Sequence, residues 1–469
     1  MTTYVSTVTR WWVLTGVSIV SFLGCLDLTI VNTAGPEIGR DLGADITTLQ
    51  LVVNIVVVAL SMFMVTAGRV GDLLGRRTAL YIGTVAFGVA SLAAGFAPTA
   101  AWLIGSRFVQ GAACAFLYTS SSTIVSDVFG DAQRGRAIGT LFAVNGLGLA
   151  AGPLLGGLVV GSLGWPWIFW LNVPLALLSL AICLPTVPPN VPDKTPAGLD
   201  WPGLALLTLG LSGLLFGLTF FDLFPITAWS ALAVGALTLL AFVQVERRVP
   251  DPIVPFALLR RPLFLAAITA EFALAFFYTT VLFLTPFFLG LTRGLDAVGV
   301  GLWMLPITAT MAVLSPLVGR VVERVGPVRV IAAGFLAFLL SAALQIAVGP
   351  ADDSVVLFVA FACMGVGWAC VLGPSAVAAL SSVPTSHGGL AVGAGWTFHN
   401  VGGAIGLALS LGLYRAVSGT TSVTAIPIEN FVAGHRAALA LVAVVATVAS
   451  VAVLLLGRSA TRPGSRHDR

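Results

Sequence analysis

The sequence predicts an all-α membrane protein with fourteen transmembrane helices. Of its 469 residues, 58% are hydrophobic and only 9% are charged, whereas a soluble domain carries about 25% charged residues. The hydrophobic residues form blocks of about 20, the length that a helix needs to cross a bilayer, and short runs between the blocks hold nearly all of the charge. Membrane barrel strands are excluded, because they alternate in polarity and span only about 10 residues.

Fourteen such blocks follow one another along the chain. The predicted spans are 11–34, 46–67, 77–96, 100–126, 137–161, 166–186, 202–220, 226–245, 262–289, 297–318, 328–348, 354–381, 388–414 and 435–456. The first block is too long for the core of a signal peptide and lacks an A-x-A cleavage site, so we expect it to be retained as the first span.

The basic residues predict the orientation of the chain. With the N-terminus in the cytoplasm, the inner side holds 18 of the 23 Lys and Arg residues, and the outer side holds Arg40, Arg293, Arg415 and Arg436. This asymmetry follows the positive-inside rule with both termini in the cytoplasm. We therefore expect a multi-pass protein of a bacterial inner membrane, in which the net charge of +4 reflects topology and not a nucleic-acid partner.

Several classes of site are missing from the sequence. There is no P-loop, no nucleophile elbow and no H-E-x-x-H motif, so we expect neither an enzyme nor a bound cofactor, and the energy for any transport must come from an ion gradient. The five cysteines all lie in apolar blocks and have no C-x-x-C spacing, which argues against disulfides and zinc. They are Cys25, Cys114, Cys183, Cys363 and Cys370.

An internal repeat relates the two halves of the chain. The segment GRVGDLLGRRTAL, from Gly68, aligns without gaps with GRVVERVGPVRV, from Gly319, at an offset of 251 residues. A duplication of six spans alone would give an offset of about 190, so about 60 residues are extra, enough for two more spans. We predict a 6+2+6 arrangement, with a six-helix bundle over 1–190, an inserted pair over 191–250 behind the Pro-rich linker, and a second bundle with a basic cytoplasmic tail over 251–469.

Two parallel six-helix halves are the arrangement of major facilitator transporters, and four motifs carry a closer resemblance. They are LDLTIVNTAGP from Leu26, GRVGDLLGRR from Gly68, RFVQG from Arg107 and NGLGLAAGPLLGG from Asn145, with GWPWIFWLNVP from Gly164 in support. On these motifs the chain resembles the fourteen-span drug:proton antiporter family of the major facilitator superfamily. The resemblance implies the major facilitator fold and export of organic compounds in exchange for protons.

The loop after the second span holds a charged motif. Asp72 stands at the entry to the third predicted span, where a carboxylate can cap free N–H groups and complement the helix dipole. Arg76 and Arg77 offer it partners, and Gly68 and Gly75 allow tight turns. The resemblance implies a latch that closes the cytoplasmic side, which the repeat extends to Gly319 and Glu323; the alternative is an ordinary basic loop.

The fifth predicted span has a small-residue face. Gly148, Gly152 and Gly156 recur every four residues, so they line one side of the helix and allow another helix to approach closely. Pro153 removes one backbone hydrogen bond and favours a bend. The resemblance implies the motif that marks antiporters, whereas the alternative is a generic packing face.

Three ionisable residues lie within predicted spans, where a charge costs about 2.5–3.5 kcal/mol. Asp27 is the candidate proton carrier, because burial favours the neutral form of a carboxyl group. Arg107 is its expected counter-charge, and the resemblance implies a proton-coupling role for it. The alternatives are a wetted polar residue for Asp27 and a packing ion pair for Arg107.

The third ionisable residue, Glu271, lies nine residues beyond Pro262, or about 13 Å along the helix, near the middle of its span. We predict a second proton site or an anchor for a cationic substrate; otherwise it is a hydrogen-bonded acid that stays protonated. Further polar residues within spans are candidates for a substrate cavity, with hydrogen bonding between helices as the alternative. They are Asn32, Asn54, Gln110, Asn145, His399 and Asn400.

Together these features predict proton:substrate antiport. Asp27 or Glu271 takes a proton from outside, substrate is released outward, and the proton is given up inside. The expected substrates are small hydrophobic or cationic organic compounds, and no obligate protein partner is evident. The alternatives are an importer of the same fold and a membrane receptor or scaffold that transports nothing.

Overall fold

The described part of the computed structural model is helical. It comprises residues 7–31, 34–44, 46–189, 201–220, 224–249, 256–295, 297–349, 354–384, 387–419 and 427–460. The helices are α1 (Thr7–Ile30), α2 (Gly35–Leu42), α3 (Ile46–Leu74), α4 (Arg76–Gly95), α5 (Ala100–Val128), α6 (Asp131–Leu163), α7 (Pro166–Trp170), α8 (Asn172–Thr186), α9 (Trp201–Thr219), α10 (Pro225–Glu246), the short 3₁₀ helix η2 (Phe256–Arg260), α11 (Pro262–Arg293), α12 (Ala297–Val325), α13 (Pro327–Ala347), α14 (Ser354–Ser381), α15 (Gly388–Ser418) and α16 (Ile428–Ala460).

Each predicted block overlaps one of these helices, but not every block is shown to span a membrane. Twelve helices in the described ranges are long and apolar enough to cross one, and α9 contributes a shorter apolar stretch, Pro202–Leu218. The count of fourteen spans and the 6+2+6 arrangement therefore stay predictions. The predicted sixth span is one of the twelve, Pro166–Thr186, and only its helical hydrogen bonding is interrupted between α7 and α8, because Pro174 has no N–H to bond the Trp170 carbonyl.

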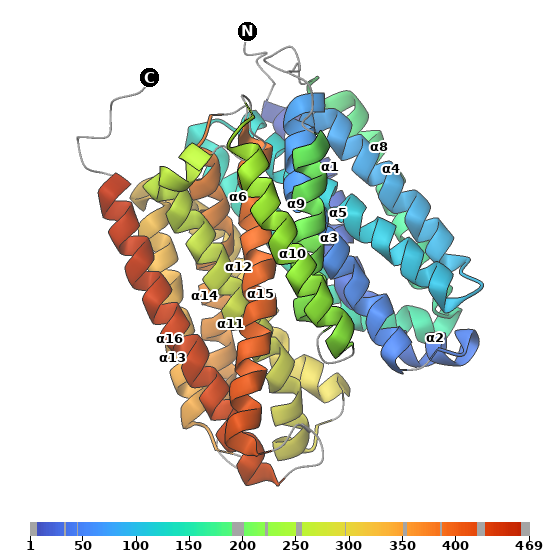
Figure 1. Ribbon diagram of the computed structural model, residues 1–469, viewed down its shortest axis with the longest axis vertical. Coiled ribbons are helices and arrows are strands. Elements are labelled where there is room, and N and C mark those ends of the chain that lie inside the picture. The colour runs from blue at the N-terminus through green and yellow to red at the C-terminus, as the bar shows by residue number, and fades with distance from the viewer. Residues whose placement is uncertain are drawn as a thin grey trace. The chain divides into compact units, whose positions relative to one another are not determined.

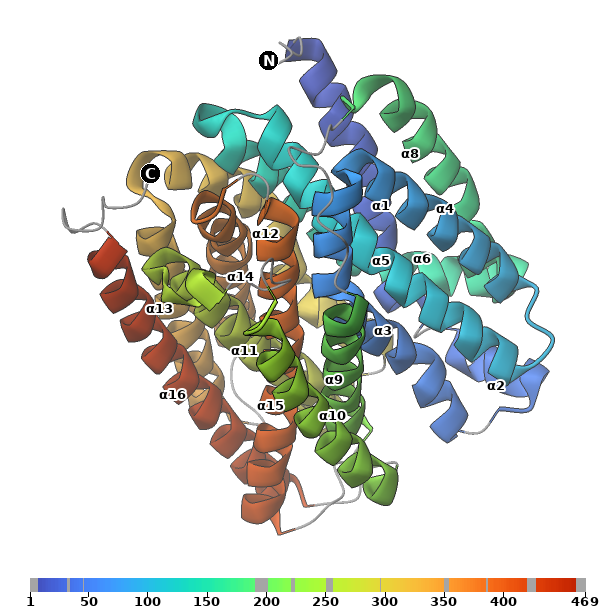
Figure 2. The same cartoon turned by 45° about the horizontal axis from the view of Figure 1, so that its top comes forward.

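The chain forms two compact units. Unit 1 comprises residues 1–258 and 383–397, and unit 2 comprises 259–382 and 398–469, so that α15 belongs to unit 1 as far as Thr397 and to unit 2 from Phe398. In unit 1, α1 packs against α6 and α8, and both α3 and α4 pack against α5. Figure 1 and Figure 2 show α4, α5 and α8 running alongside one another in this unit. The domain limits predicted at 190 and 250 stay predictions.

Unit 2 repeats part of the pairing pattern of unit 1. Here α11 packs against α14 and α16, while α12 and α13 both pack against α14. The turns matched by the sequence repeat also share their geometry, since Gly75 precedes α4 with φ 96° and Gly326 precedes α13 with φ 83°. Both values lie in the region that favours glycine, which accounts for a glycine at each of these matched positions.

The helices α9 and α10 form a pair that belongs to unit 1. Glycines bring the two together: a Cβ on Gly213 would lie 2.5 Å from the Ala231 carbonyl oxygen. The pair also docks on α3, where the hydroxyl oxygens of Thr66 and Thr208 are 2.9 Å apart. The residues predicted as an insertion thus associate with the first bundle through α9.

The close packing of α3 on α5 yields a stability prediction. A Cβ on Gly111 would overlap the backbone carbonyl of Val56, so we expect Gly111→Ala to lower the free energy of unfolding by about 1–3 kcal/mol. Gly105 on the same helix has open space around it, and Gly105→Ala is the matched control. Thermal unfolding of the purified protein measures both; equal midpoints would contradict the packing seen here.

Candidate functional site

A buried ion pair joins α1 and α5 in unit 1. The guanidinium Nη1 of Arg107 donates to Oδ2 of Asp27, and the two side chains are 1% and 0% exposed. Arg107 is held further by the Val52 carbonyl, 3.3 Å from Nε, and by the Phe169 ring, whose centroid is 5.6 Å from the guanidinium carbon. The alternative of a wetted Asp27 is therefore wrong, because this carboxylate has no contact with solvent.

Three neutral polar side chains complete the Asp27 cluster. Nε2 of Gln110 and Nδ2 of Asn172 donate to Oδ1 of Asp27 at 3.4 and 3.1 Å. The same two amides donate to the hydroxyl oxygen of Ser91 at 2.7 and 3.3 Å. The cluster thus joins α1, α4, α5 and α8, and each of its residues is at most 1% exposed.

The side chains around Asp27 all act as donors to it. Protonation would turn the carboxyl group into a donor with its own O–H. In the present arrangement the groups that donate to Asp27 do not offer an acceptor for that O–H. One buried acceptor does lie nearby, because Oδ1 of Asn172 has no hydrogen-bond partner among the described residues. Protonation of Asp27 must therefore break or reorient contacts that join four helices.

A second buried acid forms a separate cluster in unit 2. Oε1 of Glu271 on α11 accepts from the hydroxyl of Ser375 on α14, and Oε2 lies 2.7 Å from Nδ1 of His399 on α15. Nε2 of His399 is in turn 3.1 Å from the hydroxyl of Tyr278. The Tyr278 ring stacks on Trp368 at a centroid distance of 4.4 Å, so the cluster contains an acid, an imidazole and two aromatic rings.

The latch residue Asp72 caps a different helix from the one predicted. Its oxygens accept from the backbone N–H groups of Gly389 and Leu390, both at 2.9 Å. These groups open α15, which contributes to unit 1 up to Thr397, whereas α4 has no side-chain cap. The expected cap on the third span is thus wrong, although the physical reason for a carboxylate at a helix N-terminus holds for α15.

The two arginines of the latch, Arg76 and Arg77, contact different partners. Arg76 is paired with Asp127 and lies 3.5 Å from Asp72, whereas Arg77 donates to the Leu184 carbonyl at the end of α8, 2.9 Å away. Arg77 therefore ties α4 to α8. A Cβ on Gly68 would overlap the Gly389 backbone, so this glycine permits the close approach of α3 to α15.

The repeat of the latch in unit 2 has a different environment. Glu323 is exposed near the end of α12, while Gly319 is buried. Asp72, by contrast, has a side chain that is 1% exposed. The two acids are thus equivalent in sequence position but not in burial.

The small-residue face of α6 lies against α1. A Cβ on Gly148 would be 2.7 Å from the Phe22 carbonyl oxygen, and one on Gly152 would overlap the Thr29 side chain; Gly156 is also buried. Pro153 has no N–H for the carbonyl four residues earlier, which is Leu149. Thr29 donates to that Leu149 oxygen at 3.1 Å, so α1 satisfies the acceptor that the proline leaves free.

Comparison with known proteins now decides the family. The family model described as Major Facilitator Superfamily matches residues 17–407. The chain belongs to the major facilitator superfamily. It is 32% identical over 453 residues to puromycin resistance protein pur8 of Streptomyces alboniger, covering 92% of this chain and 88% of that one. It is 30% identical over 414 residues to the tetracenomycin C resistance and export protein of Streptomyces glaucescens, covering 87% and 76%.

A solved structure agrees with this fold. The crystal structure of the human organic anion transporter MFSD10 (TETRAN) superposes with a TM-score of 0.67 at 17% identity, over 95% of this chain and 99% of that one. At that identity the likeness concerns the fold alone. As a superfamily member the chain is a multi-pass membrane transporter, and its apolar helices fit that class.

The remaining cavity candidates are scattered. Gln110 lies in the Asp27 cluster and His399 in the Glu271 cluster, as described above. Asn54 is half-buried on α3, and buried polar atoms of Asn145 and Asn400 have no hydrogen-bond partner among the described residues. Asn32 lies outside the described residues, so its predicted place in a cavity stays a prediction.

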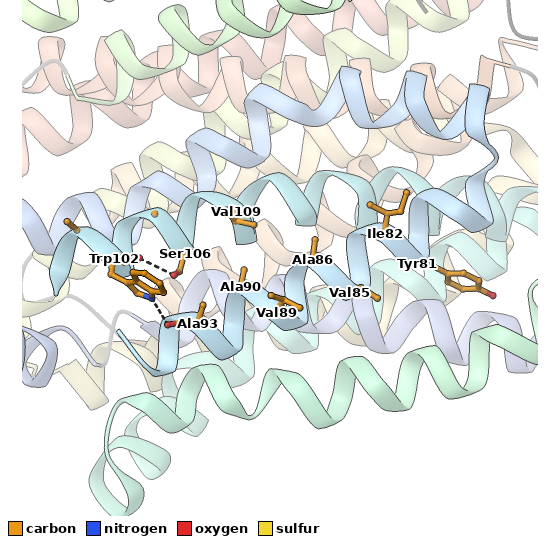
Figure 3. Close-up of a pocket in the computed structure, with 12 residues that line it drawn as sticks. Tyr81, Ile82, Val85, Ala86, Val89, Ala90, Ala93, Trp102, Ser106 and Val109 are labelled. Atoms are coloured by element: carbon orange, nitrogen blue, oxygen red, sulfur yellow. Dashed lines mark hydrogen bonds between the residues drawn. The ribbon is translucent and has the colours of Figure 1, made fainter. Parts of the chain in front are cut away.

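A groove on the surface of α4 and α5 differs from both clusters. It has a volume of about 1010 Å³ and is lined mainly by apolar side chains such as Val85, Val89 and Val109. Figure 3 shows Trp102 at one end, donating to the Ala93 carbonyl at 2.9 Å. Val85, Val89 and Trp102 are each more than half exposed, which is typical of a superfamily member's lipid-facing side and not of an ion-binding site. Within the described ranges no group of three or more His, Cys, Asp or Glu could hold a metal ion.

Sequence reasoning missed five residues of the clusters: Ser91, Asn172, Ser375, Tyr278 and Trp368. Asn172 could have been found, because it lies in the quoted GWPWIFWLNVP stretch. The serines and the tyrosine give no comparable signal, since single hydroxyls are common in transmembrane helices and mostly bond their own backbone.

The Asp27–Arg107 pair yields a stability prediction. Arg107→Met leaves a carboxylate buried without its counter-charge, so we expect a loss of about 3–5 kcal/mol. The double variant Asp27→Asn with Arg107→Met removes both charges and should recover most of that loss. Ser106→Ala is the control, because Ser106 bonds the Trp102 carbonyl in its own helix and lies outside the cluster. Denaturation in mixed micelles measures the coupling; additive effects of the two substitutions would contradict the pairing.

Proposed function

We propose that this protein exports small organic compounds from the cell in exchange for protons. The observation that carries the proposal is the fully buried carboxylate of Asp27, whose side-chain partners are all donors. A carboxylate in that setting gains a proton only when its contacts change, which couples proton binding to helix movement. An ion gradient is the energy source that this chemistry fits.

The proposed direction of transport and the proposed substrate class are inferred from the names of similar proteins. Two proteins at least 30% identical to this chain over most of its length are named for resistance to puromycin and for resistance to and export of tetracenomycin C. Both names point to removal of a toxic organic compound. We infer efflux of small hydrophobic or cationic organic compounds, including antibiotics.

The proposed cycle uses contacts within unit 1. Protonation of Asp27 from outside weakens its bonds to Arg107 and to the amides of α5 and α8. The α1 helix is packed on α6 along Gly148 and Gly152 and bonded to it through Thr29, so a shift of α1 is felt at the α6 bend. Release of Asp72 from the start of α15 then opens the cytoplasmic side, where Asp27 gives up its proton and substrate binds. Rocking of the two halves back moves the substrate outward.

The predicted topology completes the proposal. It places fourteen spans as 6+2+6 in a bacterial inner membrane with both termini in the cytoplasm, as in the fourteen-span drug:proton antiporter family. The surplus of basic residues on the inner side supports this orientation. Substrate, protons and lipid are the partners, and no cofactor or obligate protein partner is required.

Transport by reconstituted vesicles tests the coupling. A pump-deficient host carrying the protein first identifies a compound to which it gives resistance, and its flux is then followed under an imposed pH gradient. We expect wild-type flux to follow the gradient and Asp27→Asn to lose that response, because the amide cannot take up the proton. Flux indifferent to the gradient in the wild type would refute proton coupling.

A matched substitution controls for a general effect of losing an acid. Asp41 accepts from Nε1 of Trp165 at 2.8 Å outside the cluster, and Asp41→Asn should keep the gradient response. Accumulation of the compound on the cytoplasmic side would instead identify an importer. A protein that tolerates both Asp27→Asn and Arg107→Ala with no effect beyond stability would be a receptor or scaffold.

The latch gives a second prediction for transport. Asp72→Asn removes the charge that faces the N-terminus of α15, a loss of about 0.3–1 kcal/mol, and should lower turnover by up to about fivefold. Arg77→Gln cuts the tie from α4 to α8 and leaves the Asp72 contacts in place, so its effect on turnover should be smaller. Equal turnover for Asp72→Asn and wild type would contradict the latch.

A further inference from the structure

We propose that unit 2 holds a second proton-binding site, formed by Glu271, His399 and Tyr278, which gains and loses a proton independently of Asp27. This proposal rests on the proposed function in taking the proton as the coupling ion. It assigns a separate place for that ion in the other unit of the chain.

The geometry forms a continuous hydrogen-bonded chain. Glu271 and Tyr278 are seven residues apart on α11, so they lie on one face of the helix about 10 Å apart along its axis. The His399 ring lies between them, with Nδ1 2.7 Å from Glu271 and Nε2 3.1 Å from Tyr278. Glu271 and His399 are buried, whereas Tyr278 is half-buried, so the tyrosine is the most exposed member of the chain.

This chain keeps its hydrogen bonds in two protonation states. With one proton more, the imidazolium donates from Nδ1 to the carboxylate and from Nε2 to the tyrosine oxygen. With one proton fewer, Nδ1 still donates to the carboxylate and the tyrosine hydroxyl donates to Nε2. Only the direction of the Tyr278–His399 bond is reversed, so the site can exchange a proton without losing a contact.

The proton step is balanced within the site and its solvent. Hydronium gives a proton to the tyrosine oxygen as the tyrosine passes its own proton to Nε2 of His399, leaving water behind. The imidazolium so formed can pass its Nδ1 proton to Oε2 of Glu271, giving a neutral acid and a neutral imidazole. The net change is one proton moved from water to the pair, and the reverse steps release it.

The contacts of Glu271 favour a proton as its ligand over an organic cation. One carboxylate oxygen accepts from Ser375 and the other faces His399, so neither is open to a bulky ligand. The Glu271 side chain is only 8% exposed. A proton needs no additional space, whereas an organic cation would have to displace one of these partners.

The neighbouring titratable groups face other parts of unit 2. Cys370 of α14 lies against Gly334 of α13, and His435 of α16 stacks on Phe288, near the far end of α11, with centroids 5.0 Å apart. The charged residues on the helices of this unit lie toward the helix ends. They are Arg260 at the end of η2, Arg261 and Arg293 at the ends of α11, Arg320, Glu323 and Arg324 of α12, Arg329 of α13, Arg415 of α15, and Glu429, Arg436 and Arg458 of α16.

The two acids therefore have different chemistry. At Asp27 the partners are permanent donors, so protonation changes the contacts between helices. At Glu271 the partner is a histidine, whose two ring nitrogens can each donate or accept a hydrogen bond. The second site is suited to holding a proton without moving its helices.

Infrared titration of the purified full-length protein tests the proposal without any substrate. Between about pH 4 and pH 9, we expect two carboxylic-acid C=O bands to titrate, one lost in Asp27→Asn and the other lost in Glu271→Gln. His399→Gln should shift the Glu271 band and its titration and leave the Asp27 band unchanged. After a pH jump, the Glu271 band should rise several-fold more slowly in Tyr278→Phe than in the wild type.

A matched control and a clear contrary result complete the test. Thr280 is a buried hydroxyl on the same helix that donates to Ser410 at 3.0 Å, and Thr280→Val should leave the rate unchanged. A Glu271→Gln spectrum identical to wild type across the titration would overturn the second site while leaving the proposed role of Asp27 intact. A titrating Glu271 band with a silent Asp27 would instead overturn that role and support the second site.

Discussion

The ion pair between Asp27 and Arg107 is the constraint on which the rest of unit 1 depends. Two opposite charges enclosed in an apolar helix bundle are stable only together, with their remaining hydrogen-bonding groups satisfied. Gln110, Asn172 and Ser91 meet that requirement from α5, α8 and α4. The same contacts that stabilise the pair also fix four helices against one another, so a change in the charge of Asp27 is a change in helix packing.

The other motifs of unit 1 connect to this constraint through α1 and α15. Thr29, half a turn beyond Asp27, bonds the carbonyl that Pro153 leaves without its helical partner, which joins the ion-pair helix to α6. Near the C-terminal end of α3, Asp72 accepts hydrogen bonds from two backbone N–H groups at the start of α15. Backbone glycines at Gly68 and Gly389 bring the two helices into direct contact. In the proposed cycle these are the contacts that break and re-form as the transporter changes state.

Part of this arrangement could be predicted from the sequence. Charges inside apolar spans are so costly that few exist. Asp27 could therefore be paired with Arg107 from the sequence, because few other charged residues within spans were available as partners. The hydroxyl partners could not be predicted, because Ser91 and Tyr278 resemble many other hydroxyl residues in the chain. The partner of Asp72 could not be predicted either, because it is a pair of backbone N–H groups more than 300 residues further along the chain. Periodicity located the helices, but the break before Asn172 depended on the local effect of Pro174.

The most direct test of the central claim is hydrogen–deuterium exchange of α1, α4, α5 and α8 as a function of pH, corrected for the intrinsic pH dependence of exchange. The account predicts that exchange around the cluster rises in the wild type as the pH falls, because protonation of Asp27 loosens the four helices. In Asp27→Asn the same segments should exchange fast at every pH, with no further response. Equal protection in the wild type and in Asp27→Asn at every pH would contradict the account.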